Sequence, residues 1–206
     1  GTDRICLYGI DVSGHGISSA LMTARLAGYL SASTLEQNVA LVEIGQGRFA
    51  MRSPAETVAA FNRLILSEMD TEHYFTMVLA DVDLARGDVT LVQAGHPHPA
   101  VQRSDGRVEF VGGGGLPVGL LEGAEYEQVR FRLDPGDRLL IHSDGIVECP
   151  DSSGRLLDSN GLSMMLRDLR NTTGPACLET LIWTLAEFAG TEDFSDDVSA
   201  VLLEFK

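Results

Sequence analysis

The stretch that most constrains this chain runs from Leu7 to Leu30 and reads LYGIDVSGHGISSALMTARLAGYL. Its short apolar run, Leu7–Ile10, is typical of the end of a buried strand. That run delivers one carboxylate, Asp11, to the point where the chain must turn. Gly14 and Gly16 then let backbone groups approach an ion or a phosphate closely. The pattern fits a metal or phosphate site, and it equally fits an acidic turn between two buried elements.

A helix is expected directly after these glycines. The apolar positions that recur at helical spacing are Ile17, Ala20, Leu21, Ala24 and either Ala27 or Leu30. Ser18 or Ser19 stands where a residue could cap the start of this helix.

The length and composition indicate a globular protein. A chain of 206 residues can form one domain with a full-sized core or two small ones. Hydrophobic residues make up 44% and charged residues 22%, which is ordinary for a soluble domain. No apolar run approaches the roughly 20 residues that cross a bilayer, so no membrane partner is expected. The chain starts with neither a signal peptide nor Met, which predicts that it is a piece of a longer protein.

The charge balance limits the partners. Acidic residues number 30 and basic residues 15, a formal charge of −15. Because such a field repels polyphosphate, nucleic acid is not expected to bind, and an anionic substrate would need a cation at its site. The three cysteines, Cys6, Cys149 and Cys177, have no metal-ligand spacing. Reduced thiols in the cytoplasm are the simplest interpretation.

One helix start is marked clearly. Ser53 as N-cap, Pro54 at the first helical position and Glu56 three residues after the cap form a capping box. The helix is expected to run to about Met69, with its buried face marked by apolar residues at helical spacing. The preceding segment, Leu30–Arg52, has no clean period and is expected to be a helix end followed by a loop.

The middle of the chain is rich in strand signals separated by turn residues. Strands are expected at Phe75–Leu84, Val89–Ala94, Ala100–Arg103, Val108–Val111, Tyr126–Leu133, Arg138–His142 and Val198–Phe205. Amphipathic helices are expected at Leu162–Leu169 and Leu178–Phe188, with Trp183 in the core. Antiparallel strands in series, with helices toward either end, predict an α+β fold.

Two motifs allow a chemical and a structural interpretation. The four consecutive glycines Gly112–Gly115 suggest a phosphate loop, but no Gly-Lys-Ser/Thr follows, so a flexible loop is favoured. His96 and His98 occupy alternate positions and could share a metal. The two prolines beside them favour a rigid corner instead.

Three acids, Asp11, Asp144 and Asp196, each stand where an expected strand meets a loop. Folding a sheet could bring them to one rim, where hard oxygen ligands would suit Mg²⁺ or Mn²⁺. Acids at strand ends are common, so the positions alone leave this open.

Five short motifs occur in a fixed order along the chain. They are Asp11-Val12-Ser13-Gly14-His15-Gly16, Ala94-Gly95-His96-Pro97, Leu116-Pro117-Val118-Gly119, Ser143-Asp144-Gly145-Ile146 and Asp196-Asp197-Val198-Ser199. Together they resemble the bacterial SpoIIE-type branch of the PPM, or type 2C, metal-dependent serine/threonine phosphatases. The resemblance covers nearly the whole chain as a single domain. It implies a four-layer α-β-β-α sandwich of two antiparallel sheets flanked by helices, with two Mg²⁺ or Mn²⁺ ions at one end.

The resemblance also implies roles for single residues. The implied metal ligands are Asp11, which would bridge both ions, the backbone carbonyl of Val12, Asp144 and Asp196. Asp197 would help to hold its loop, and His15 is the candidate proton donor. His96 matches a glycine-histidine corner of the family, which agrees with the structural interpretation.

The implied activity is hydrolysis of phosphoserine or phosphothreonine on a protein, without a cysteine nucleophile. The family leads us to expect an anti-sigma-factor antagonist as substrate and control by an upstream receiver or sensory domain, with this chain as the C-terminal output domain.

One feature departs from the family pattern. The family carries a Gly-Asp-x-x-Asp motif on a first metal-binding strand, whereas here only ten residues precede Asp11, and Asp3 is the one acid among them. The alternative function is therefore a catalytically impaired, phosphatase-like domain that serves as a regulatory protein-binding module. Without that strand, the apolar edge at Leu7–Ile10 would invite another chain, for example a second copy in a homodimer.

Overall fold

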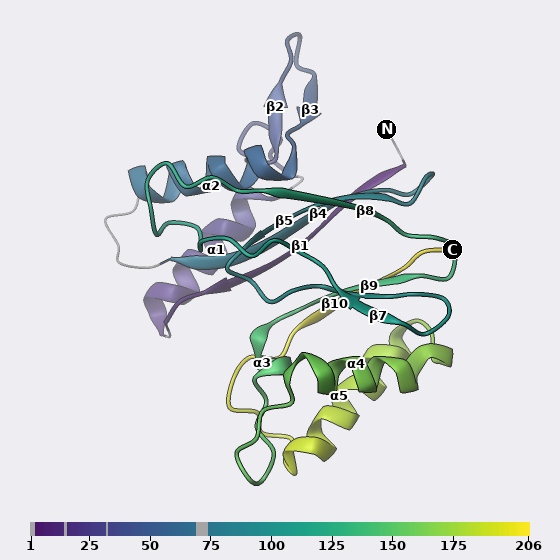
Figure 1. Ribbon diagram of the computed structural model, residues 1–206. Helices are drawn as coiled ribbons and strands as arrows, with labels where there is room; N and C mark the ends of the chain where they lie inside the picture. The colour runs from purple at the N-terminus through teal and green to yellow at the C-terminus, as the bar shows by residue number, and fades with distance from the viewer. Residues whose placement is uncertain (1–2, 15, 32, 69–73) are drawn as a thin grey trace.

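The computed structural model describes residues 3–14, 16–31, 33–68 and 74–206, and shows two stacked sheets between two layers of helices (Figure 1). The elements in chain order are β1 (Arg4–Val12), α1 (Ile17–Tyr29), β2 (Leu41–Glu43), β3 (Phe49–Met51), α2 (Pro54–Glu68), β4 (Phe75–Asp83), β5 (Asp88–Ala94), β6 (Ala100–Gln102), β7 (Val108–Phe110), β8 (Gln128–Arg132), β9 (Arg138–His142), α3 (Asp144–Val147), α4 (Asp158–Asp168), a 3₁₀ turn (Leu169–Asn171), α5 (Pro175–Ala189) and β10 (Ala200–Glu204). The predicted α+β class and four-layer sandwich are confirmed.

Both large sheets are antiparallel. The first has the strand order β1-β4-β5-β8 and the second β10-β9-β6-β7. Helices α1 and α2 cover the outer face of the first sheet, and α4 and α5 cover that of the second (Figure 1). The strand order places β1 and β10, which lie far apart in the sequence, at sheet edges.

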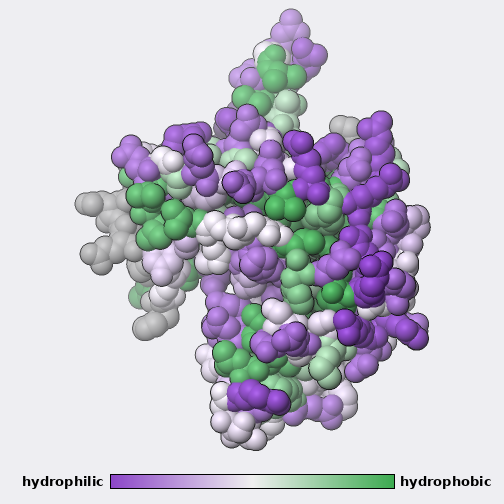
Figure 2. Space-filling model, in the orientation of Figure 1, coloured by the Kyte–Doolittle hydropathy of each residue, from purple (hydrophilic) through white to green (hydrophobic). Residues whose placement is uncertain are grey.

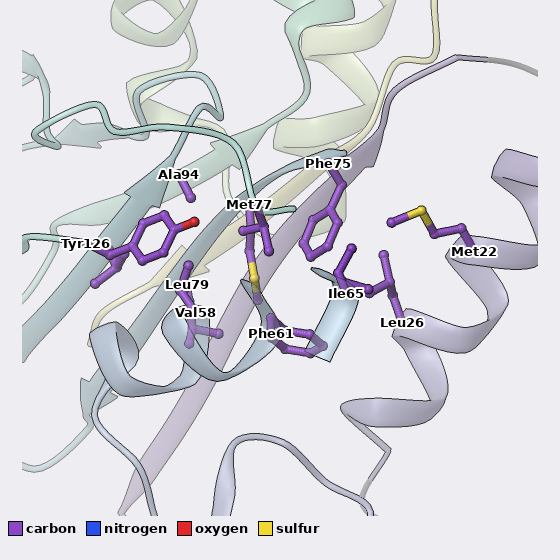
Figure 3. Close-up of a cluster of buried hydrophobic side chains, with 12 residues drawn as sticks. Met22, Leu26, Val58, Phe61, Ile65, Phe75, Met77, Leu79, Ala94 and Tyr126 are labelled. Carbon is purple, nitrogen blue, oxygen red and sulfur yellow. The ribbon is translucent and has the colours of Figure 1, made fainter. Parts of the chain in front are cut away.

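The apolar core has three parts, as the four layers require. One lies under α1 and α2, where Phe61 and Phe75 meet edge to face with ring centroids 6.1 Å apart (Figure 3). A second lies between the other sheet and α4 and α5, around Ile146 and Leu181. The third fills the space between the sheets and includes Ile141 of β9. This inner layer fixes the two sheets to each other, and with them the loops at their ends.

The predicted capping box at the start of α2 is confirmed. The Glu56 carboxylate accepts the Ser53 backbone N–H at 2.9 Å, and the Ser53 hydroxyl accepts the Glu56 backbone N–H at 3.3 Å. The Ser53 hydroxyl also donates to the Glu56 carboxylate at 2.7 Å, and this bond, followed by that from the Ser53 N–H, lowers the pKa of Glu56. The helix buries Val58 and Phe61 against the sheet, as its spacing predicts.

The buried face predicted for α1 is wrong. Ile17 and Leu21 are 82% and 64% exposed, and the helix packs through Met22 and Leu26 instead. These two residues also recur at helical spacing, so periodicity alone does not say which stripe meets the sheet. The serine cap is wrong as well, because the helix begins after Gly16 without a side-chain cap, and the Ser19 hydroxyl instead donates to the Gly16 carbonyl.

The segment expected to be a loop before Arg52 contains a hairpin instead. Strands β2 and β3 pair antiparallel, and the Ile44 N–H and Arg48 carbonyl continue the pairing toward the turn. Gly45 and Gly47, which interrupt the sequence pattern, adopt the positive φ angles that the turn needs. The hairpin projects from the body and carries half-exposed apolar side chains (Figure 2).

The expectation that Trp183 lies in the core is also wrong, since its side chain is 60% exposed. Helix α5 buries Cys177, Leu181 and Leu185, and Trp183 falls on the opposite side of the helix. All three cysteines lie in the described ranges and are free thiols. Within those ranges no helix combines the length and apolar character that a bilayer span requires.

Candidate metal centre

The end of β1, the start of α3 and the loop into β10, which carry the three acids named by the motifs, lie at the same end of the sandwich, at the left in Figure 1. Asp11 is next to last in β1, opposite Thr76 of β4. Asp144 begins α3, two residues after the last residue of β9. Asp196 lies in the loop that leads into β10. Because β9 and β10 are neighbours in the second sheet and β1 borders the first, three separate loops meet at this rim.

The pKa of Asp11 reflects the closeness of these acidic loops. The pKa of Asp11 is raised, first by burial and then by the negative charges of Asp144, Asp196 and Asp197. A hydrogen bond with the Val12 backbone offsets part of this shift. Like charges disfavour the ionised carboxylate. The rim is thus a place where a cation would relieve repulsion.

Two adjoining hollows open at the rim. Asp11, Val12, Asp196 and Asp197 line a cavity of about 630 Å³, together with the start of α1. Asp144 borders the neighbouring hollow of about 380 Å³. None of the described residues that line either hollow is a lysine or an arginine. An anionic ligand would therefore meet carboxylates with no lysine or arginine among these described residues to neutralise it.

The histidine corner forms as predicted. His96 is only 4% exposed, and its Nδ1 lies 3.0 Å from the Thr76 hydroxyl oxygen. Burial is the main cause that lowers the pKa of His96, to about 4. His98 is exposed beside the smaller hollow, while His142 is buried with Nδ1 2.9 Å from the Ser143 carbonyl oxygen.

The glycine run at Gly112–Gly115 is a loop, and the Gln93 side chain accepts the Gly114 N–H at 2.8 Å. It lines the smaller hollow only through Gly114.

Asp11, Val12 and Asp196 therefore line one cavity, and Asp144 borders the hollow beside it. The candidate proton donor His15 lies outside the described residues. The donor set suits a divalent cation, because carboxylate and carbonyl oxygens are hard ligands and the rim has excess negative charge. Within the described ranges, however, no three His, Cys, Asp or Glu side chains already converge closely enough to hold a metal ion.

Sequence reasoning missed the residues that fasten this rim. The hydroxyl of Ser143 bonds to the backbone at Asp197 and Ser199, and no periodic pattern predicts such a contact. Its one signal in the sequence is its place directly before Asp144 in a motif.

The comparisons with known proteins agree with this arrangement. The family model described as Stage II sporulation protein E (SpoIIE) matches residues 1–206. The chain belongs to the SpoIIE family.

Relatives of this SpoIIE-family domain include two proteins of Bacillus subtilis (strain 168). One is named phosphoserine phosphatase RsbP, 28% identical over 202 residues that cover 97% of this chain and 46% of that protein. The other is named phosphoserine phosphatase RsbU, 23% identical over 199 residues, with 95% and 54% covered. The SpoIIE-family domain thus spans about half the length of the curated relatives it matches.

Among solved structures, the SiaA-PP2C domain of Pseudomonas aeruginosa has a TM-score of 0.78 and 22% sequence identity. The likeness covers 99% of this chain and 81% of that one. The SpoIIE-family domain therefore has the PP2C fold.

Proposed function

We propose that this domain is a metal-dependent phosphatase acting on phosphoserine or phosphothreonine in a protein. The observation that carries the proposal is the acidic rim, where Asp11 and Asp196 line a cavity without a lysine or arginine among its described lining residues, and Asp144 borders the hollow beside it. A phosphate dianion would be repelled there unless cations stood between it and the carboxylates.

The residues proposed to hold Mg²⁺ or Mn²⁺ are Asp11, the carbonyl of Val12, Asp144 and Asp196, with two ions in the intact site. Bound there, the ions would supply an activated water and would neutralise the phosphate. The protein's own part is to fix the three loops, to hold Asp11 beside acidic neighbours whose repulsion a cation would relieve, and to leave the cavity open to a substrate side chain. His15 is proposed as the proton donor for the leaving serine or threonine oxygen.

Hydrolysis of p-nitrophenyl phosphate and of a phosphoserine peptide, measured with Mn²⁺, with Mg²⁺ and with excess chelator, tests the proposal. We expect turnover only with added metal, and Asp144→Asn and Asp196→Asn should each abolish it while the domain still unfolds cooperatively. Full activity in chelator would rule the proposal out.

The proposed substrate is a small phosphorylated anti-sigma-factor antagonist, and the proposed setting is the output domain of a cytoplasmic signalling protein with an upstream receiver or sensory domain. The names of RsbP and RsbU support the phosphoserine chemistry. Candidate phosphorylated antagonists, offered one at a time with matched peptides as controls, would identify the substrate by release of phosphate.

One observation favours a second candidate, the regulatory module that binds a protein without hydrolysis. No metal-ligating group of three side chains is already gathered among the described residues. Calorimetry separates the two candidates: the module would bind the phosphorylated protein without turnover at saturating Mn²⁺, whereas the enzyme would release phosphate.

A further inference from the structure

Ser143 joins two of the three acidic loops. Its side chain is buried, and its backbone N–H donates to the Ser199 carbonyl at 3.0 Å. Its hydroxyl donates to the Asp197 carbonyl at 2.8 Å and accepts the Ser199 N–H at 2.9 Å. These bonds continue the β9–β10 pairing beyond His142 and Ala200, the last pair of the ladder.

The two acids of the loop that Ser143 contacts, Asp196 and Asp197, are not held by burial. Asp196 and Asp197 are both exposed, and the Asp196 carboxylate accepts the Asp197 N–H at 2.7 Å. Their like charges favour a loop that swings outward, away from Asp11 and Asp144. The bonds to Ser143 oppose that movement.

Gly145 lets the same loop come close. A Cβ on Gly145 would lie 2.5 Å from the Asp197 carbonyl oxygen and 3.0 Å from its carbonyl carbon. The residue sits inside α3, where alanine is intrinsically favoured over glycine. Space for Asp197, rather than backbone conformation, therefore explains a glycine at this position.

We propose that Ser143 and Gly145 are positioning residues, which hold the Asp196–Asp197 loop against the Asp144 turn and thereby set the metal affinity of the rim. This role rests on the proposed function. Neither residue contributes a ligand: Ser143 acts through its backbone bonds to the loop, and Gly145 through its lack of a side chain. Ligands held at fixed separation bind a cation more tightly than ligands that must be drawn together, and supporting residues of this kind typically change affinity by about 10- to 100-fold.

The test is a titration of the metal-free domain with Mn²⁺. The affinity is measured from the electron paramagnetic resonance signal of the unbound ion and, independently, by calorimetry. Ser143→Ala and Gly145→Ala should each weaken Mn²⁺ binding by about 10-fold or more. Ser143→Thr keeps the hydroxyl and should restore affinity toward the wild-type value. Thr57→Ala is the matched control, because it removes a buried hydroxyl of α2 that donates to the Ser53 backbone carbonyl at 3.0 Å. It should lower thermal stability without changing Mn²⁺ affinity.

A second readout does not need the metal. Hydrogen exchange at the Ser199 amide should accelerate in Ser143→Ala, because this N–H loses its acceptor. Should Ser143→Ala fail to fold, Gly145→Ala tests the same contact without removing a hydrogen bond.

Three outcomes would overturn the inference. Wild-type Mn²⁺ affinity in a folded Gly145→Ala or Ser143→Ala domain would refute the positioning role while leaving the phosphatase proposal intact. An equal loss of affinity in Thr57→Ala would show a general effect of instability instead. A wild-type domain that binds no Mn²⁺ would overturn the metal centre and this role together.

Discussion

Strands β1 and β9 have similar sequences, an apolar run that leads to an aspartate, and yet they occupy different environments. All five residues of β9 are buried, because the strand lies between β10 and β6. Strand β1 is the edge of its sheet and pairs only with β4 among the described strands, and Tyr8 is 41% exposed. An apolar run ending in an acid therefore predicts a strand, but its burial depends on neighbours that come from elsewhere in the chain.

The two strands come close together at Gly9. A Cβ on Gly9 would lie 2.8 Å from His96 Nε2 and 3.0 Å from a side-chain methyl of Ile141 in β9. The buried His96 ring fills the space between the sheets beside Thr76. The acidic rim is therefore attached to a fully buried strand, β9, and to a partly exposed edge strand, β1. We expect substitutions in the two strands to differ in their effects.

The largest effect is expected from truncating the interior strand. Leu140 of β9 is 1% exposed, so Leu140→Ala should reduce the free energy of unfolding by about 2–5 kcal/mol. Leu7→Ala in the half-buried β1 should cost less than half as much, since fewer contacts are lost. Urea denaturation of both variants measures the difference. Equal losses would mean that β1 is as well supported as β9.

The next effect concerns the acids at the two strand ends. We expect Asp11→Asn and Asp144→Asn each to abolish metal-dependent turnover, because each removes a proposed carboxylate ligand. In the metal-free domain Asp11→Asn should also raise the melting temperature. Burial and acidic neighbours raise the pKa of Asp11, so its ionised form opposes folding at neutral pH, and an amide removes that penalty. Calorimetry in chelator checks this; a lower melting temperature would contradict the crowding of the acids.

The smallest effect is a pH dependence at the contact between the sheets. The pKa of His96 is lowered to about 4, against about 6.5 in an unfolded chain. Its stabilising contribution is thus complete above pH 6.5 and declines as the pH falls toward 4. At pH 5 the wild type should have lost about 2 kcal/mol more than His96→Asn, relative to pH 7.5. The free energies of unfolding of the wild type and of His96→Asn are measured between pH 4 and pH 7.5. If the two proteins lose the same free energy as the pH falls, burial does not shield His96 from protonation.

Much of the fold is predictable where the local signal coincides with the packing. Strand β9 has the predicted bounds, and the capping box at Ser53 forms as its residues indicate. The errors occur where a local pattern has two solutions. Helix α1 has a second apolar stripe, Met22 and Leu26, which packs in place of Ile17 and Leu21. Trp183 stands among the apolar residues of α5 in the sequence, which predicts a core position, but its side of the helix faces outward.

The candidate site was predictable from its motifs but not from its geometry. Acids at three strand ends indicate a shared rim only once the order of the strands is known, and that order depends on pairing between distant segments, such as Arg4 of β1 with Asp83 of β4. The hydrogen bonds of Ser143 could not be predicted from local sequence either, because its partners lie over fifty residues away in the chain. The ligand roles of Asp11, Val12, Asp144 and Asp196, and the role of His15, stay predictions.

The turn of the β2–β3 hairpin is a suitable place to attach a tag or a label. None of its residues belongs to the three apolar clusters of the described core, and its Gly45–Gly47 turn points away from the body (Figure 1). Exposed turns of this kind tolerate inserted sequence. An affinity tag or a fluorophore placed in the turn would report on the domain from a position remote from the acidic rim, so that immobilised protein would keep its cavity open to substrate.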